Sequence, residues 1–153
     1  MVERLGIHMF GIVIVSHGKM AEGLEDSCRL FFPNGLENVK TCCLFQEDGP
    51  DEFEEKIDKC IQEVDVGEGA VVLCDLYGGT PCNCAARLVM RKYPDVPVIT
   101  GVNLAMLLEL LGYRLSQNNI KDIDLQHIMD SGKKGVILVN DALNRKKEDD
   151  FFE

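Results

Sequence analysis

A short run of β-branched residues that ends beside a histidine constrains the fold more than any other feature of this sequence. Residues Ile12 to Val15 carry no polar side chain, and His17 follows them closely. An uninterrupted apolar strand is buried on both faces, which is typical of parallel sheets covered by helices on each side. Open α/β sheets form their sites beyond the carboxyl ends of the strands. We therefore expect His17 to lie where chemistry takes place, with a purely structural histidine as the alternative.

The remainder of the chain alternates between strand-like and helix-like segments. Strands are expected at residues 10–15, 39–45, 70–74, 96–100 and 136–139, and helices at residues 19–32, 50–64, 80–90, 103–111 and 121–129. This alternation predicts an α/β fold with three layers, a doubly wound and mostly parallel sheet, and a flavodoxin-like strand order. The last strand follows the charged, flexible stretch Ser131 to Gly135, so we expect it to be exchanged between the subunits of a dimer.

The length of 153 residues suits one domain. We expect a loose extension over residues 1–8, the domain over residues 9–140, and a charged tail over residues 141–153 that is disordered beyond Leu143.

The charge balance argues against two classes of partner. The chain carries 26 acidic and 16 basic residues, a formal net charge of -10. Nucleic acid and anionic membranes recruit basic patches, so the charge argues against both. It allows a basic protein partner. Apolar runs are far shorter than the about 18 residues that span a bilayer, and no leader pattern is present, so we expect a cytoplasmic protein.

The seven cysteines show neither Cys-x-x-Cys pairs nor the Cys/His spacing of zinc ligands. They predict no disulfide framework and no metal site, and we interpret most of them as small buried hydrophobes. Cys82 and Cys84 lie near the expected site and are the two candidates for reactivity.

A carboxylate and a glycine-rich turn follow the third expected strand. Asp75 at that strand end can accept a hydrogen bond from one ring nitrogen of His17 and leave the other nitrogen with a free lone pair. Gly78, Gly79 and Thr80 can present backbone N–H groups to a phosphate at a helix start, with Thr80 as the N-cap. Together these residues predict a histidine that carries a phosphoryl group. The alternative is structural, with a simple turn and a strand-end cap.

Several other features are absent or uninformative. The sequence has no Gly-x-Gly-x-x-Gly after its first strand and no P-loop, so neither a dinucleotide cofactor nor direct use of ATP is expected, and we predict no cofactor. His8 belongs to the extension. His127 is expected on a surface helix without a functional role.

Three segments together resemble a known family. They are Gly11-Ile-Val-Ile-Val-Ser-His17-Gly18, Asp75-Leu-Tyr-Gly-Gly-Thr-Pro-Cys-Asn83 and Thr100-Gly-Val-Asn-Leu-Ala-Met106. In this order they are similar to the signature segments of the EIIA domain of the mannose family of the bacterial phosphoenolpyruvate-dependent sugar phosphotransferase system (PTS), over about residues 9–140.

The resemblance implies a phosphotransferase with a phosphohistidine intermediate. His17 would accept a phosphoryl group from the carrier protein HPr and pass it to an EIIB component, expected on a separate chain, which serves the EIIC and EIID membrane subunits. Asp75 matches the aspartate that holds the active histidine, and Thr80 matches a hydroxyl residue at the helix start. The family also implies a homodimer that exchanges the strand at residues 136–139.

Two alternative functions stay open at this point. The first is a phosphocarrier subunit that supplies phosphate to dihydroxyacetone kinase. Such subunits resemble this chain in fold and also use a histidine after the first strand. A flavodoxin-like regulatory or binding module without enzymatic activity is the alternative from a different class.

Overall fold

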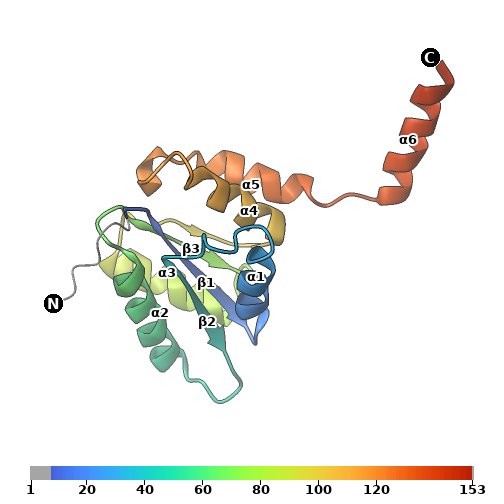
Figure 1. Ribbon diagram of the computed structural model, residues 1–153. Coiled ribbons are helices and arrows are strands. Elements are labelled where there is room, and N and C mark those ends of the chain that lie inside the picture. The colour runs from blue at the N-terminus through green and yellow to red at the C-terminus, as the bar shows by residue number, and fades with distance from the viewer. Residues whose placement is uncertain (1–7, 153) are drawn as a thin grey trace.

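Four parallel strands form the centre of the molecule, and helices cover both faces of their sheet (Figure 1). The computed structural model describes residues 8–152, so residues 1–7 of the predicted extension lie outside the described part. The strands are β1 (Gly11–His17), β2 (Val39–Leu44), β3 (Ala70–Cys74) and β4 (Val98–Ile99). They lie in the order β2-β1-β3-β4 and all pairs are parallel. This confirms the predicted doubly wound sheet with its flavodoxin-like order.

The helices divide between the two faces of the sheet. They are α1 (Met20–Cys28), α2 (Pro50–Val64), α3 (Thr80–Lys92), α4 (Leu104–Tyr113), α5 (Leu125–Lys134) and α6 (Val139–Phe152), with a short 3₁₀ helix, η1 (Ile120–Asp122). Helices α2 and α3 pack on one face of the sheet, and α1, α4 and α5 lie on the other. The three predicted layers are therefore present.

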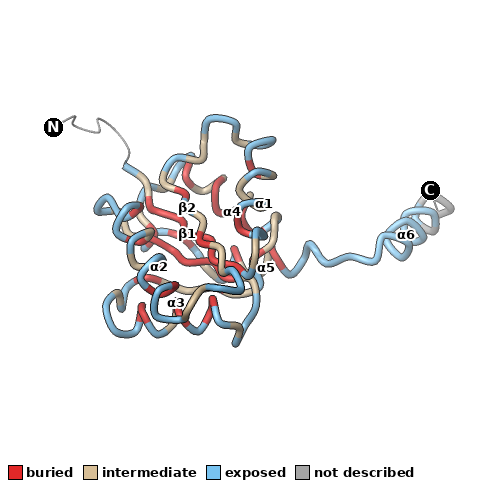
Figure 2. Tube along the Cα trace, turned by 90° about the horizontal axis from the view of Figure 1, so that it is seen from below, coloured by how far each residue is buried: buried red, intermediate tan, exposed pale blue. Residues whose placement is uncertain are grey.

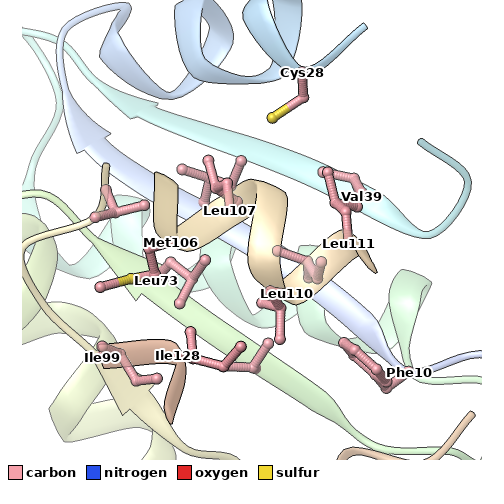
Figure 3. Packing of buried hydrophobic residues seen from close by; sticks show 14 of the residues in the cluster. Phe10, Cys28, Val39, Leu73, Ile99, Met106, Leu107, Leu110, Leu111 and Ile128 are labelled. Carbon is pink, nitrogen blue, oxygen red and sulfur yellow. The ribbon is translucent and has the colours of Figure 1, made fainter. Parts of the chain in front are cut away.

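The side chains of β1 divide the core into two halves. Ile12 and Ile14 belong to a cluster with α1, α4 and α5 (Figure 3), whereas Val13 and Val15 belong to a second cluster with α2 and α3. All four side chains are at most 1% exposed. Burying each contributes about 1.5 to 3 kcal/mol, which explains why this strand carries no polar residue before its end. Figure 2 shows the same pattern, with buried chain in the centre and exposed chain on the outer helices.

Two helix starts follow their sequence signals. Gly49 precedes α2 with Pro50 in its first turn, and the Asn103 side chain accepts a hydrogen bond from the Met106 N–H at 3.0 Å at the start of α4. The prediction for α3 is wrong by one residue, because Gly79 precedes the helix and Thr80 is its first residue.

Two helix boundaries also differ from expectation. Helix α1 ends at Cys28, whose carbonyl accepts from the N–H groups of both Phe31 and Phe32 in a terminal turn. Helix α5 begins after Asp124, which caps it, and runs to Lys134. The stretch predicted as a flexible connection is therefore largely helical, and its Gly132 is buried against α4.

The predicted strand at residues 136–139 is wrong for the single chain. Residues 136–138 are irregular and Val139 begins α6. A strand needs a neighbour for its backbone groups, and α5 carries this segment away from the sheet, so the side chains of residues 136–139 are 62 to 87% exposed. The tail predicted to be disordered is helical instead, since residues 141–148 are rich in helix formers. Helix α6 projects from the body of the molecule (Figures 1 and 2).

A buried arginine closes the amino end of the sheet. The Arg114 guanidinium, just after α4, donates hydrogen bonds to the carbonyls of Phe10, Glu37 and Asn38 at 2.6 to 3.1 Å. Burial lowers the pKa of Arg114 to about 10, so the side chain stays charged at neutral pH. It ties α4 to the starts of β1 and β2.

Candidate functional site

The site lies where β1 and β3 end side by side. Val15 pairs with Cys74 in the sheet, so the residues that follow, His17 and Asp75, emerge at the same edge. The chain then turns sharply at Gly18, whose φ of 52° is a conformation that favours glycine. The Gly18 N–H donates to the Leu44 carbonyl at 2.8 Å, which attaches this turn to the end of β2.

His17 and Asp75 are in direct contact. The Oδ2 atom of Asp75 lies 2.8 Å from Nδ1 of the His17 ring and also accepts a hydrogen bond from the His17 backbone N–H at 2.8 Å. The Oδ1 atom of Asp75 accepts from the Leu76 N–H at 2.7 Å. With Nδ1 facing a carboxylate, the proton of a neutral ring lies on Nδ1 and the lone pair lies on Nε2.

The two side chains of the pair differ in their exposure to solvent. The Asp75 side chain is 10% exposed, and the His17 side chain is 46% exposed. Burial acts to raise the pKa of Asp75, but the hydrogen bonds from His17 and Leu76 outweigh it and lower that pKa below its ordinary value. Asp75 is therefore an anion at neutral pH, and the imidazole beside it can be reached from outside.

The backbone of Gly79 lies directly against the imidazole ring of His17. A Cβ atom at this position would lie 2.7 Å from Cε1 and 3.3 Å from Nε2 of His17, so any side chain would displace the ring. The neighbouring Gly78 has a φ of 78°, and its carbonyl accepts from the Asn83 side chain at 3.0 Å. Glycines at both positions therefore let the turn approach His17 closely.

The start of α3 provides N–H donors beside this ring. The Gly79 N–H already donates to the Leu76 carbonyl at 3.1 Å, within the turn. Within residues 8–152, no acceptor binds the backbone N–H groups of Thr80 or Cys82, and Pro81 between them has none. The free donors of the predicted anion cradle are thus at the first and third residues of α3.

Ser16 is a site residue that our sequence reading missed. Its side chain is fully buried, and its Oγ accepts from the Ala21 N–H at 2.8 Å and donates to the Gly18 carbonyl at 3.1 Å. Ser16 thereby holds both sides of the turn that carries His17. A polar residue between an apolar run and a strand-end histidine is the signal that could have identified it.

The remaining candidates do not join the site. Cys82 and Cys84 are buried, and burial raises the pKa of Cys84. The His127 Nε2 atom lies 2.9 Å from Oε1 of Glu109, on the outer surface of α4 and α5. His8 is exposed at the start of the described chain.

No helix within residues 8–152 is long and apolar enough to cross a membrane.

Components of the sugar phosphotransferase system are among the known proteins with a similar sequence. The mannose-specific PTS EIIAB component of Escherichia coli strain K12 is 30% identical over 125 residues, which cover 82% of this chain and 38% of that protein. The fructose-specific PTS EIIA component of Bacillus subtilis strain 168 is 30% identical over 69% of this chain and 71% of its own length. The chain thus spans well under half of the E. coli relative.

Solved structures of the same kind share the fold. A mannose/sorbose-specific IIA subunit from Enterococcus faecalis has a TM-score of 0.72 and 28% identity, over 85% of this chain and 94% of that one. A PTS IIA protein associated with the fucose utilization operon of Streptococcus pneumoniae has a TM-score of 0.76 and 28% identity, over 88% and 98%.

The sequence model of the EIIA-man family, described as the PTS system fructose IIA component, matches residues 11–128. This match covers far more than half of the 153 residues and includes β1, β3 and the start of α3. The chain therefore belongs to the EIIA-man family of PTS components.

Proposed function

We propose that this protein is a histidine phosphocarrier of a sugar phosphotransferase system. His17 accepts a phosphoryl group from phosphorylated HPr and passes it to an EIIB component. The observation that carries the proposal is the 2.8 Å contact between Nδ1 of His17 and Oδ2 of Asp75, which leaves Nε2 as the exposed nucleophile. Family membership supports the class of partner.

The transfer exchanges one phosphorus–nitrogen bond for another. The lone pair of His17 Nε2 attacks phosphorus, and the bond to the donor histidine breaks with its electron pair returning to that ring. His17 keeps its Nδ1 proton, so its ring becomes cationic as the new bond forms. The carboxylate of Asp75 stabilises this charge through a hydrogen bond that already exists before the reaction.

The start of α3 stabilises the negative charge of the phosphoryl group. A phosphoryl group on Nε2 brings negative charge close to a carboxylate, and this repulsion disfavours the phosphorylated state. The free N–H groups of Thr80 and Cys82 lie at the positive end of a helix beside the ring, where an anion gains about 0.3 to 2 kcal/mol. The two contributions offset each other, so the phosphoryl group can be both accepted and released.

The proposed partners place the reaction in the cytoplasm. HPr and EIIB are the proposed exchange partners, and the EIIC and EIID membrane subunits are reached only through EIIB. The His17 side chain is 46% exposed, which suits contact with another protein.

The direct test is labelling with phosphoenolpyruvate, Enzyme I and HPr. The parent chain should gain one acid-labile, base-stable phosphate, and His17→Ala should gain none. His127→Ala is a matched control, because His127 is also exposed and also contacts a carboxylate, and it should be labelled like the parent. Labelling of His17→Ala at the parental rate would overturn the assignment. Transfer to EIIB, and not to a dihydroxyacetone kinase, identifies the acceptor.

We further propose that the protein is a homodimer joined through residues 136–139. This segment is apolar and exposed, and β4 leaves the edge of the sheet with only two residues paired to β3. Pairing of the segment with the β4 edge of a second copy would bury both. Ile137→Asp with Leu138→Asp should convert a dimer to a monomer in sedimentation equilibrium. Leu115→Asp, at an apolar side chain that is exposed elsewhere, should leave the mass unchanged.

A further inference from the structure

A side chain of α3 binds the turn that lies against the His17 ring. The Nδ2 atom of Asn83 donates a hydrogen bond to the Gly78 carbonyl at 3.0 Å. The backbone N–H of the same residue donates to the Gly79 carbonyl at 2.9 Å. Asn83 therefore binds the peptide groups on both sides of the Gly79 Cα atom.

Only the side-chain bond depends on the type of residue at position 83. The bond between the Asn83 N–H and the Gly79 carbonyl joins residues four apart, as in any helix, and every residue except proline can supply it. Gly78 lies before the first residue of α3, so its carbonyl needs a donor on a side chain that reaches back past the helix start. Because a carbonyl oxygen can only accept, the amide nitrogen of Asn83 is the atom that faces it.

The turn has few other features that keep its shape. The Gly79 N–H donates to the Leu76 carbonyl at 3.1 Å, and Gly78 between them has a φ of 78°, the value typical of the third residue in a type II turn. Two consecutive glycines can adopt many alternative conformations at low cost. In the peptide group that joins them, the N–H binds Leu76 and the carbonyl binds Asn83. With both of its ends bound, this group cannot rotate freely.

Rotation of this peptide group would move the surface against which the imidazole rests. A Cβ atom at Gly79 would lie 2.7 Å from Cε1 and 3.3 Å from Nε2 of His17, so the Gly79 backbone and the ring are in close contact. Asp75 holds the opposite side of the ring through the 2.8 Å contact with Nδ1. The direction of the Nε2 lone pair therefore depends on the carboxylate and on the turn together.

We propose that Asn83 is a positioning residue, whose amide fixes the Gly78–Gly79 peptide group and through it the His17 ring. The bond of the Asn83 amide is to the turn, so the residue acts through Gly79. Its effect on phosphoryl transfer rests on the proposed phosphocarrier function of His17, whereas its effect on the ring does not. A nucleophile that is slightly misplaced reacts more slowly, because its lone pair no longer points at the reacting atom.

Replacement of Asn83 by Ala removes the amide and leaves α3 intact. Alanine is a better helix former than asparagine, and both Asn83 and Gly78 are exposed, so the free energy of unfolding should change little. Met90→Ala is the matched control, because Met90 lies on the same helix with a side chain that is 84% exposed. Circular dichroism should show that both variants are folded.

NMR of protein labelled with ¹³C in its histidine rings observes the effect on His17 directly. We expect the Cε1–H signal of His17 to shift or broaden in Asn83→Ala and to stay in place in Met90→Ala. His127 is an internal reference, since its ring contacts Glu109 away from the turn and should give the same signal in all three proteins. A His17 signal that is identical in the parent and in Asn83→Ala would overturn the proposal.

Labelling kinetics separate positioning from direct contact with a partner protein. A misplaced ring slows the transfer step itself, so Asn83→Ala should have a kcat roughly two- to tenfold lower with phosphorylated HPr, at an unchanged KM. A raised KM with an unchanged kcat would show that Asn83 contacts the partner, and would overturn the positioning role. If the parent chain itself is not labelled, the phosphocarrier function fails, and the NMR comparison alone decides the role of Asn83.

Discussion

A single oxygen atom, Oδ2 of Asp75, binds His17 twice, at the backbone N–H and at ring Nδ1, with both distances 2.8 Å. The two contacts fix the ring relative to its own backbone, because rotation about the side-chain bonds would break one contact while the other stayed. The carboxylate thus sets both the direction of the imidazole and the nitrogen that carries the proton.

Replacement of Asp75 by Asn should slow phosphoryl transfer without unfolding the protein. An amide can still accept a hydrogen bond but carries no charge to stabilise the cationic ring. A loss of about 1.4 to 4 kcal/mol of barrier stabilisation slows transfer by roughly one to three orders of magnitude. The measurement is the rate of labelling from phosphorylated HPr, with circular dichroism to verify folding. Phosphorus NMR should locate the group on Nε2 in the parent, and a signal from Nδ1 would contradict the proposed role of Asp75.

The contribution of Asp75 to stability should depend on pH in a defined direction. Its pKa is lowered in the folded protein, so its stabilising effect is present above the unfolded value of about 3.9 and is lost as the pH falls through the folded value. The difference in unfolding free energy between the parent and Asp75→Asn should therefore be largest near neutral pH and shrink below about pH 4. Urea denaturation across this range measures it. Asp141→Asn, at an exposed side chain of α6, should show no such trend.

Substitution of Gly79 by Ala should disturb the His17 ring specifically. The added Cβ would lie 2.7 Å from Cε1 of His17, closer than real contacts allow, and the ring is the movable partner. We expect Gly79→Ala to fold, to lose the contact between Nδ1 and Asp75, and to be labelled at least about tenfold more slowly. Gly23→Ala is the control, since a Cβ there meets no atom within 4 Å. A Gly79→Ala variant that is labelled at the parental rate would show that ring position is not limiting.

Removal of the Ser16 hydroxyl should affect both stability and transfer. Ser16→Ala leaves the Ala21 N–H and the Gly18 carbonyl without their partner, at a cost of about 1 to 3 kcal/mol. Because these groups flank His17, the transfer rate should fall even at temperatures where the variant is fully folded. Thermal unfolding and labelling at low temperature separate the two effects. Ser116→Ala, at an exposed position, should change neither.

The central fold was predictable because it rests on local patterns. An apolar run without polar interruption indicates a strand buried on both faces, and residues 12–15 of β1 and all of β3 follow this rule. The meeting of His17 and Asp75, which are 58 residues apart, follows from the same pattern, since neighbouring parallel strands end at one edge.

Features that depend on hydrogen bonding between particular atoms were not predictable. Thr80 carries a good capping side chain, yet the turn places Gly79 before the helix. The role of Ser16 requires knowing that its hydroxyl reaches across the Gly18 turn. The segment at residues 136–139 has strand composition, but whether it pairs depends on a neighbour that its own sequence does not encode.

The placement of Arg114 separates the anchor of the sheet from the site of transfer. Its guanidinium fastens the amino end of the sheet, while His17 occupies the carboxyl end of β1, about 20 Å away along the strand. A substitution at Arg114 should therefore weaken the fold as a whole without changing the contact between His17 and Asp75.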